Sequence, residues 1–207
     1  MNVRRGVGWF ASLLFVGAGL ALIAVFLLGQ NPGSTATNKP DPGGFNVPEL
    51  GNAQESQDAA SEGPADKTLT ITIPKMGQIE DDTVPDTTGD DEPALKQNAA
   101  IHLKGTGFPW QKEANVYLAG HRLGYPNTDS FLAFWDLNKL ENGDKAFVTD
   151  SEGTKYTYQV FKEFIVEPSD LYVTEPVPGR DILTLQTCTL PDYSKRLIVQ
   201  AELVAVA

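Results

Sequence analysis

An uncharged run near the N-terminus, Val7–Leu28, constrains this chain of 207 residues more than any other feature. A helix rises about 1.5 Å per residue, so a run of this length crosses a hydrocarbon core of about 30 Å. Arg4 and Arg5 precede the run, and the next basic residue is Lys39. The positive-inside rule therefore predicts a single-pass plasma-membrane anchor, with residues 1–6 inside the cell and the rest outside.

A cleaved signal peptide is the alternative interpretation of the same residues. The apolar region of a signal peptide is only about 7–15 residues long, and no Ala-x-Ala cleavage site directly follows Leu28. We therefore expect an uncleaved transmembrane helix over residues 7–28.

The segment after the anchor, residues 29–66, is rich in Asn, Pro, Gly, Ser, Ala and acidic residues and shows no hydrophobic period. Such a composition buries too little apolar surface to fold and is typical of a flexible spacer. We therefore assign residues 29–66 to an extracellular linker and residues 67–207 to one folded domain, which is long enough for a core of its own.

Charge and composition exclude several classes of partner. The net charge of −11 argues against nucleic acid, because phosphate binding needs a basic face. One cysteine and two histidines are too few for the usual zinc sites. Residues 80–92 are rich in carboxylates but lack the ligand spacing of an EF-hand, which favours a solvated acidic loop. We expect no metal and no cofactor.

Short alternating runs separated by turn residues dominate from Lys67 onward and predict a mainly β domain. Many short strands with little helix favour a closed or nearly closed β-barrel. The expected strands are residues 69–73, 115–120, 146–149, 156–166, 181–188 and 196–206, and the expected short helices are residues 93–100 and 131–137.

The single cysteine, Cys188, stands at the end of the run ILTLQTC. It cannot form an internal disulfide, so it is a buried filler, an intermolecular link or a reactive thiol. Side chains alternate between the two faces of a strand, and the apolar Leu183 and Leu185 should face the core. Cys188 then lies on the opposite face, which favours a reactive thiol.

The same alternation places a histidine and an arginine on the off-core face at strand ends. In NVYLAGH, Val116 and Leu118 face the core and His121 does not; in RLIVQA, Leu197 faces the core and Arg196 does not. A thiolate is a strong nucleophile, an imidazole can protonate a leaving amine, and a guanidinium can hold a developing oxyanion. Together the three side chains predict acyl transfer through a thioester.

Three segments resemble those of the sortase family. TLQTC at 184–188 resembles the Thr-Leu-x-Thr-Cys signature, LAGHR at 118–122 the segment that holds the histidine, and KRLIVQAEL at 195–203 the final strand with its arginine. The resemblance covers residues 67–207, and the anchor and linker fit the same plan. It implies a sortase-like eight-stranded closed β-barrel with one or two short helices, preceded by a single transmembrane helix.

The resemblance also implies a reaction and its partners. Sortases cleave a Leu-Pro-x-Thr-Gly signal, or a variant of it, near the C-terminus of a secreted protein. Cys188 would attack the carbonyl between Thr and Gly, and His121 would protonate the departing amine. Arg196 would hold the carbonyl or oxyanion. An amine of a cell-wall precursor or of a pilin lysine would then resolve the thioester.

Substrate-binding residues follow from the resemblance alone. AGHRLGY places Tyr125 four residues after the histidine, as in the class E sortases of actinobacteria, where this tyrosine is linked to a preference for Leu-Ala-x-Thr-Gly. Thr187 belongs to the cysteine signature. The loop of residues 167–179 shapes the signal pocket in sortases. Its apolar candidates here are Leu171, Tyr172 and Val173.

Several alternatives stay open. In a thiol peptidase, water would resolve the acyl-enzyme; an inactive barrel would only bind peptides; a thiol redox protein would need a resolving cysteine that the sequence lacks. Lys195 adjoins Arg196, and strand register decides which of them faces Cys188, with the inward Leu197 favouring Arg196. We interpret His102 as structural, because the other histidine fits the chemistry better.

Overall fold

The computed structural model describes residue 47 and residues 63–207 of the chain. The predicted anchor and nearly all of the predicted linker lie outside the described residues. Within the described part of the chain, no helix is long and apolar enough to cross a membrane.

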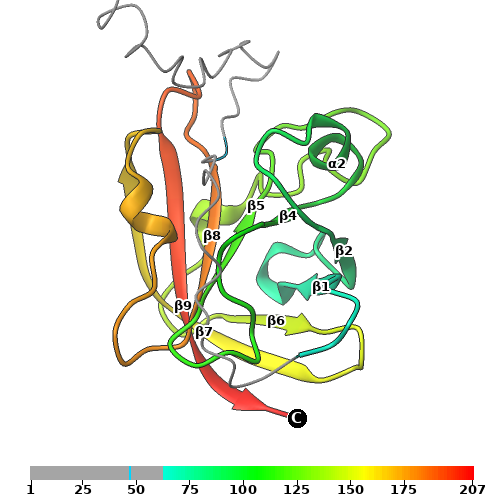
Figure 1. Cartoon of the computed structure of the whole chain (residues 1–207). Helices are drawn as coiled ribbons and strands as arrows, with labels where there is room; N and C mark the ends of the chain where they lie inside the picture. Colours follow the sequence, from blue (N-terminus) through cyan, green and yellow to red (C-terminus); the bar gives the residue numbers. More distant parts are fainter. Residues whose placement is uncertain (1–46, 48–62) are drawn as a thin grey trace, which may run out of the picture. The chain divides into compact units, whose positions relative to one another are not determined.

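The described domain is built on one mixed sheet in the order β2-β1-β6-β7-β9-β8-β5-β4-β3. Only short helices interrupt the strands, so the prediction of a mainly β domain is confirmed (Figure 1). The strands are β1 Leu69–Thr72, β2 Asp82–Val84, β3 Asp86–Thr87, β4 Ile101–Leu103, β5 Asn115–Ala119, β6 Lys145–Thr149, β7 Lys155–Val166, β8 Ile182–Cys188 and β9 Arg196–Val206. The helices are η1 Pro74–Met76, α2 Glu92–Gln97, η2 Leu137–Lys139 and η3 Leu171–Thr174.

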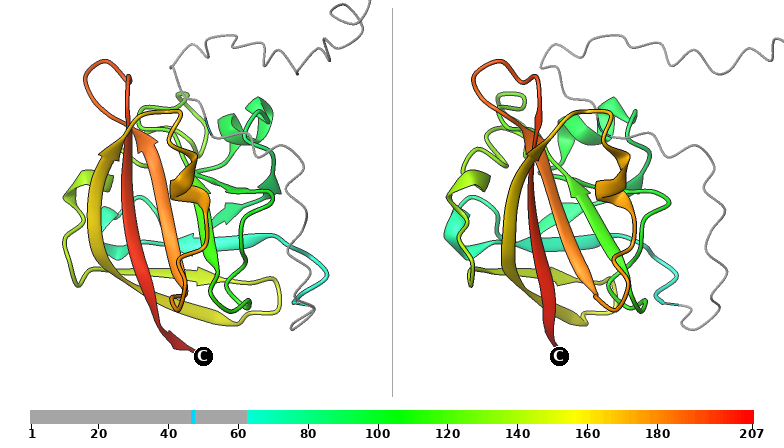
Figure 2. Two further views of the ribbon diagram at one scale, coloured as in Figure 1. Left: turned by 60° about the vertical axis from the view of Figure 1, so that its left-hand side comes forward. Right: turned by 90° about the vertical axis from the view of Figure 1, so that its left-hand side faces the viewer.

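The two edges of the sheet meet at Pro85. β2 pairs with β1 at one edge and β3 pairs with β4 at the other, and only Pro85 separates them in sequence. The sheet therefore curls into a nearly closed barrel (Figure 2). Proline has no N–H to donate to a ladder, so it divides residues 82–87 into two strands. This division gives nine strands, one more than the eight that the family resemblance implies.

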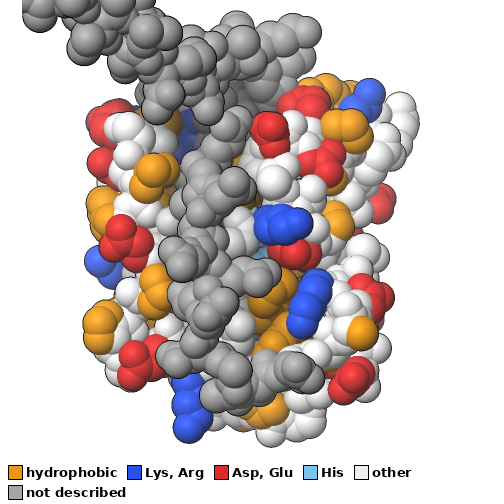
Figure 3. Space-filling model, viewed as in Figure 1, with side chains coloured by type: hydrophobic (Ala, Val, Ile, Leu, Met, Phe, Trp, Pro, Cys, Tyr) orange, Lys and Arg blue, Asp and Glu red, His pale blue; other side chains and the backbone are white. Residues whose placement is uncertain are grey.

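Two sequence predictions were wrong around this framework. The expected acidic loop, residues 80–92, contains β2 and β3, although acidic residues are depleted in strands. The expected helix at residues 131–137 is a series of turns ending in η2. Leu132 has a φ of 58°, which no α-helix tolerates, and its N–H donates to the Leu123 carbonyl. Acidic side chains are spread over the face seen in Figure 3.

Apolar clusters cover both faces of the sheet, which we name the inner and the outer cluster. The inner cluster forms the barrel core, and burial of each such side chain contributes about 1.5–3 kcal/mol. It contains Val116, Leu118, Leu183, Leu185, Leu197, Val199 and Ala201, as alternation predicts. The outer cluster contains Tyr117, Ala119, Cys188 and Ile198 from the same strands, together with Val47, Leu95, Ile101, Leu103, Val166 and Val173.

Segments outside the sheet supply part of the outer cluster. η3 lies over the outer face of β8 and β5 and contributes Val173 (Figure 2). Asn115 fixes it there, because its Nδ2 donates to the carbonyl oxygens of Val173 at 2.9 Å and Glu175 at 3.0 Å. The off-core face is therefore covered, and the chemistry expected on it takes place beneath a second apolar layer.

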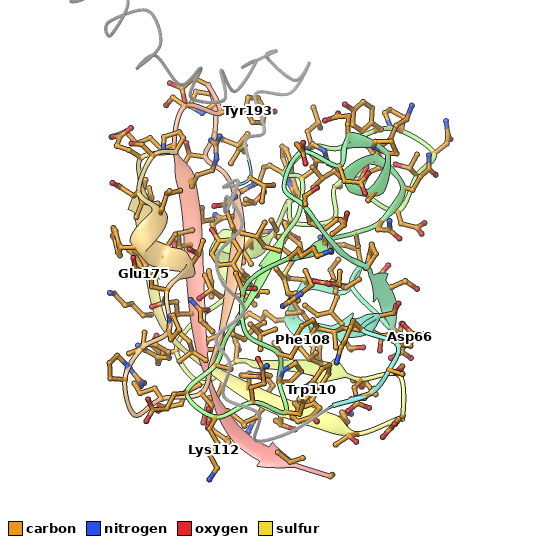
Figure 4. The ribbon with its side chains drawn as sticks, in the orientation of Figure 1. Asp66, Phe108, Trp110, Lys112, Glu175 and Tyr193 are labelled. Atoms are coloured by element: carbon orange, nitrogen blue, oxygen red, sulfur yellow. The ribbon has the colours of Figure 1, made fainter. Side chains whose placement is uncertain are left out.

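His102 on β4 is fully buried and hydrogen-bonded through both ring nitrogens. Its Nδ1 lies 2.8 Å from Asp86 Oδ1 and its Nε2 lies 3.0 Å from the Gly107 carbonyl oxygen. These contacts tie β4 to β3 and to the loop after β4. The loop also carries Phe108 and Trp110, which stack with centroids 4.7 Å apart (Figure 4). The geometry fits the structural role predicted for this histidine.

We expect His102→Ala to lower the free energy of unfolding by about 2–4 kcal/mol, because it leaves a cavity and removes two buried hydrogen bonds. Urea unfolding followed by tryptophan fluorescence measures the change. Lys104→Ala, at an exposed position just after the same strand, is the control and should change stability by less than about 0.5 kcal/mol. Equal stability of the two variants would contradict the structural role.

Candidate active site

Three adjacent strands bring the predicted histidine, cysteine and arginine into one row. Cys188 and Arg196 are directly opposite partners in the antiparallel pair β8–β9. β5 runs parallel to β8 with Ala119 opposite Gln186, and Gly120 N–H donates to the Gln186 carbonyl at 3.0 Å. Continuing this register by two residues places His121 beside Cys188. Neighbouring strands lie about 4.8 Å apart, so the three side chains start within reach of one another.

A glycine at position 120 allows the chain to carry His121 past the end of β5. A Cβ at Gly120 would lie 2.5 Å from the Ala99 carbonyl oxygen, so a larger residue would push these segments apart. Beyond it, Phe134 N–H donates to the His121 carbonyl at 3.1 Å. The histidine side chain is 5% exposed. Its backbone is thus held on both sides.

Strand register decides between the two neighbouring cations at the start of β9. Arg196 is 2% exposed, and its Nη1 donates to the carbonyl oxygens of Tyr193 at 3.2 Å and Lys195 at 3.1 Å. Tyr193 lies in the β8–β9 loop, at the end of the sheet that carries the site (Figure 4). Lys195 points to solvent, where its Nζ lies 2.7 Å from Glu167 Oε1. The guanidinium, and not the ammonium, therefore belongs to the row.

Cys188 is 1% exposed. The sequence places it correctly off the core side, but the outer cluster covers it, so the thiol is not open to solvent. Val166 stands opposite Arg196 across the β7–β9 pair, and Val173 and Ile198 belong to the same cluster. A peptide that reaches the sulfur has to bind among these apolar side chains.

A second guanidinium near the site was missed by sequence reasoning. Arg122 is 6% exposed, and its Nη2 donates to Asn138 Oδ1 at 2.6 Å. Burial lowers the pKa of Arg122, while the charges of Asp136, Glu163, Tyr193 and Cys188 act in the opposite direction. Its interaction with Cys188 adds positive potential next to the thiol, a setting that favours a thiolate. Arg122 directly follows the candidate histidine in the sequence, and this position could have indicated that it lies near the site.

A buried pair, Tyr117 and Gln186, lies on the same face as Cys188 and was also missed. The Tyr117 hydroxyl donates a short hydrogen bond to Gln186 Oε1. Burial raises the pKa of Tyr117 and nearby Arg196 opposes the shift, so the hydroxyl stays protonated and remains a donor. The alternation of side chains along each strand already placed these residues on the same face as the cysteine. Only the register between β5 and β8 shows that they contact each other.

The predicted substrate-binding residues fall in different surroundings. Tyr125 lies edge-on to His121 with ring centroids 5.5 Å apart, and its hydroxyl donates to Glu92 Oε1 at 2.7 Å. Val173 packs in the outer cluster, whereas Leu171 and Tyr172 are exposed on η3. Thr187 is fully buried. Because it alternates with Cys188, its side chain faces the inner side of the sheet and is not placed to contact a peptide at the sulfur.

Within residues 47 and 63–207, no group of three or more His, Cys, Asp or Glu side chains is arranged to hold a metal ion.

The family model described as "Sortase domain" matches residues 71–204, which make up more than half of the chain. The chain belongs to the sortase family. Sortase A of Streptococcus agalactiae is 36% identical over 89 residues, which cover 43% of this chain and 36% of that relative. The match thus spans about a third of the relative's length.

Solved sortases share the barrel. Sortase A from Corynebacterium diphtheriae superimposes with a TM-score of 0.58 at 26% identity, over 68% of this chain and 62% of that one. Sortase C-1 from Actinomyces oris gives 0.57 at 31% identity, over 66% and 73%. These relatives carry the names sortase A and sortase C, so the predicted class E membership stays a prediction.

We expect Tyr117→Phe to destabilise this sortase by about 1–3 kcal/mol, because the amide of Gln186 loses its buried partner. Tyr125→Phe also removes one hydroxyl, but from a partly exposed position, and should cost less than about 1 kcal/mol. Thermal unfolding of the two variants side by side measures the difference. If both variants melt together, the buried pair does not support the sheet.

Proposed function

We propose that this sortase is a membrane-anchored cysteine transpeptidase that acts on a sorting signal near the C-terminus of secreted proteins. The observation that carries the proposal is the row formed by Cys188 on β8, Arg196 opposite it on β9, and His121 two residues beyond the end of the neighbouring β5. A nucleophile, an acid–base group and a fixed cation in one row form the set that acyl transfer requires. The predicted anchor over residues 7–28 keeps this domain outside the cell, where such proteins emerge.

The reaction begins when the Cys188 sulfur, as thiolate, attacks the carbonyl carbon between Thr and Gly of the signal. Arg196 faces the sulfur from the next strand and stabilises the charge on the carbonyl oxygen. The C–N bond then breaks, His121 delivers a proton to the glycine amine, and a thioester remains. An amine of a cell-wall precursor or pilin lysine attacks the thioester carbonyl and His121 takes up its proton. The C–S bond breaks as the new amide forms, and the Cys188 thiolate and the imidazolium of the starting state are restored.

The outer cluster supports the binding of an apolar signal. Val166, Val173 and Ile198 lie in the same buried cluster as the sulfur. They suit the leucine that begins the signal, because an apolar pocket gains about 25 cal/mol for each Å² of apolar surface removed from water. Leu171 and Tyr172, exposed on the neighbouring η3, extend this surface outward.

Tyr125 supports the class E preference for Leu-Ala-x-Thr-Gly. Its ring stands next to the imidazole, and its hydroxyl is directed to Glu92 on α2. A tyrosine held there narrows the space beside the second residue of the signal and favours alanine over proline. The proposal assigns this discrimination to the Tyr125–Glu92 pair.

The deciding experiment incubates the enzyme with Leu-Ala-x-Thr-Gly and Leu-Pro-x-Thr-Gly peptides and an amine, followed by mass spectrometry. We expect a thioester on Cys188, a product joined to the amine, and faster turnover of the Leu-Ala peptide. Release of cleaved peptide with no response to added amine would indicate a thiol peptidase. Absence of any thioester would indicate a barrel that only binds peptides.

Alanine substitutions of the three residues in the row test whether each of them contributes to kcat/KM. Cys188→Ala and His121→Ala should lower kcat/KM by more than about a thousandfold, because bond formation and proton transfer fail. Arg196→Ala should lower it by about a hundredfold or more through loss of the oxyanion contact.

Lys195→Ala is the matched control for Arg196→Ala. It removes a cation one residue away that forms only a surface ion pair with Glu167, so kcat/KM should change less than about twofold. A larger loss with Lys195→Ala than with Arg196→Ala would show that the register argument assigns the wrong cation.

A further inference from the structure

The side-chain amide of Gln186 is only half satisfied by the protein. The residue is 1% exposed, and its Oε1 accepts the hydrogen bond from the Tyr117 hydroxyl. Its Nε2 is buried and has no hydrogen-bond partner within the described part of the chain. This nitrogen carries two donor hydrogens, and the great majority of buried polar groups in folded proteins have a partner. The unused donor of Gln186 is therefore a candidate for contact with a ligand.

Gln186 lies between the sulfur and the pocket proposed for the first signal residue. It precedes Cys188 by two residues on β8, so the two side chains leave the same face of the sheet. Across the β8–β9 pair it stands directly opposite Ile198, which belongs to that apolar pocket. A signal whose leucine fills the pocket and whose threonine carbonyl reaches the sulfur therefore passes over Gln186.

A second buried glutamine on the same face provides a contrast. Gln200 on β9 is 8% exposed and stands opposite Thr184. Its Nε2 donates to Thr184 Oγ1 at 3.3 Å, so the protein itself supplies the partner. In Gln186 the Tyr117 hydroxyl holds the oxygen of the amide, and the planar amide then directs its nitrogen away from Tyr117.

We propose that Gln186 is a substrate-binding residue whose Nε2 donates to the main-chain carbonyl oxygen of the second signal residue. The inference deepens the proposed function and rests on it, because it needs the signal to extend from the sulfur to the leucine pocket. Two residues span about 6.6 Å in an extended chain, both along β8 and along the signal. With the threonine carbonyl at Cys188, the carbonyl of the second signal residue lies level with Gln186.

The direction of the carbonyl groups supports the same pairing. In an extended chain, groups two residues apart point to the same side. The carbonyl of the second residue and that of the threonine therefore point to the same side, as the side chains of Gln186 and Cys188 do on β8. The contact holds the signal in register, so that the scissile carbonyl meets the sulfur. Tyr117 acts as a positioning residue, because it fixes the orientation of the amide.

The first test measures kinetics of the full chain in detergent micelles, with both signal peptides and an amine. Gln186→Met keeps an unbranched side chain but removes the donor, so KM should rise about tenfold while kcat changes less than about twofold. Alanine and proline both offer the carbonyl, so the rise in KM should be equal for the Leu-Ala and the Leu-Pro peptide. Gln200→Met is the matched control and should change KM less than about twofold.

A double variant separates binding from folding. Gln186→Met leaves the Tyr117 hydroxyl buried without its acceptor and should lower the melting temperature. In Tyr117→Phe/Gln186→Met both partners are gone, so the melting temperature should return toward that of the wild type while KM stays about tenfold raised. Recovery of KM together with the melting temperature would show that Gln186 acts only through the fold, and the inference would be overturned.

A modified peptide tests the carbonyl itself. In a Leu-Ala peptide, a trans-alkene in place of the amide bond after the second signal residue removes the carbonyl assigned to Gln186. This change should raise KM about tenfold for the wild type and less than about twofold for Gln186→Met. The same replacement after the first residue is the control and should affect both enzymes equally. If the alkene after the second residue also affects both equally, Gln186 does not bind that carbonyl.

Calorimetry of peptide binding separates this inference from the proposed function. Cys188→Ala forms no thioester, yet adding Gln186→Met to it should raise the Kd for the Leu-Ala peptide about tenfold. If the wild type transfers peptide to the amine and Gln186→Met leaves KM and Kd unchanged, the inference alone is overturned. If no enzyme cleaves a peptide but Kd rises with Gln186→Met, the proposed function fails and the contact stands. If no peptide binds, both are overturned.

Discussion

Hydrogen-bond register across β5, β8 and β9 is the constraint on which the site depends. The antiparallel β8–β9 ladder sets Cys188 opposite Arg196. The parallel β5–β8 ladder ends at Ala119 and Gln186, and its direction leads the chain on to His121 beside the end of β8. A slip of one residue in either ladder would turn one partner to the other face. The inner cluster prevents such a slip, because it would expose Leu183, Leu185 and their neighbours. Core packing and site geometry are therefore one property of these strands.

The apolar side chains that cover the site keep water away from its polar groups. A thiol, an imidazole and two guanidinium groups are nearly excluded from water, so charge interactions among them are stronger than at an open surface. Under the proposed function, the same cover supplies the contacts for an apolar signal. Val47 packs in the same cluster and so adds to this cover.

The sequence predicted much of the barrel because its strong signals are local. Alternation assigned the faces of β5, β8 and β9 correctly, and the motifs led to the family that the comparisons establish. The failures involve interactions that alternation does not contain. Asp82 and Asp86 join strands because Pro85 sits where the sheet edges meet, and residues 131–137 turn because Leu132 adopts a positive φ.

By itself, the sequence determined which residue types face each side of every long strand, since the two-residue period is fixed by the covalent chain. Only the tertiary structure decided which strands are neighbours and in which register. It therefore decided that Arg196 and not Lys195 faces the thiol, and that Tyr117 meets Gln186. It also decided that the off-core face is buried, because η3, α2 and Val47 come from distant parts of the chain. No local pattern encodes that approach, which depends on the closure of the whole sheet.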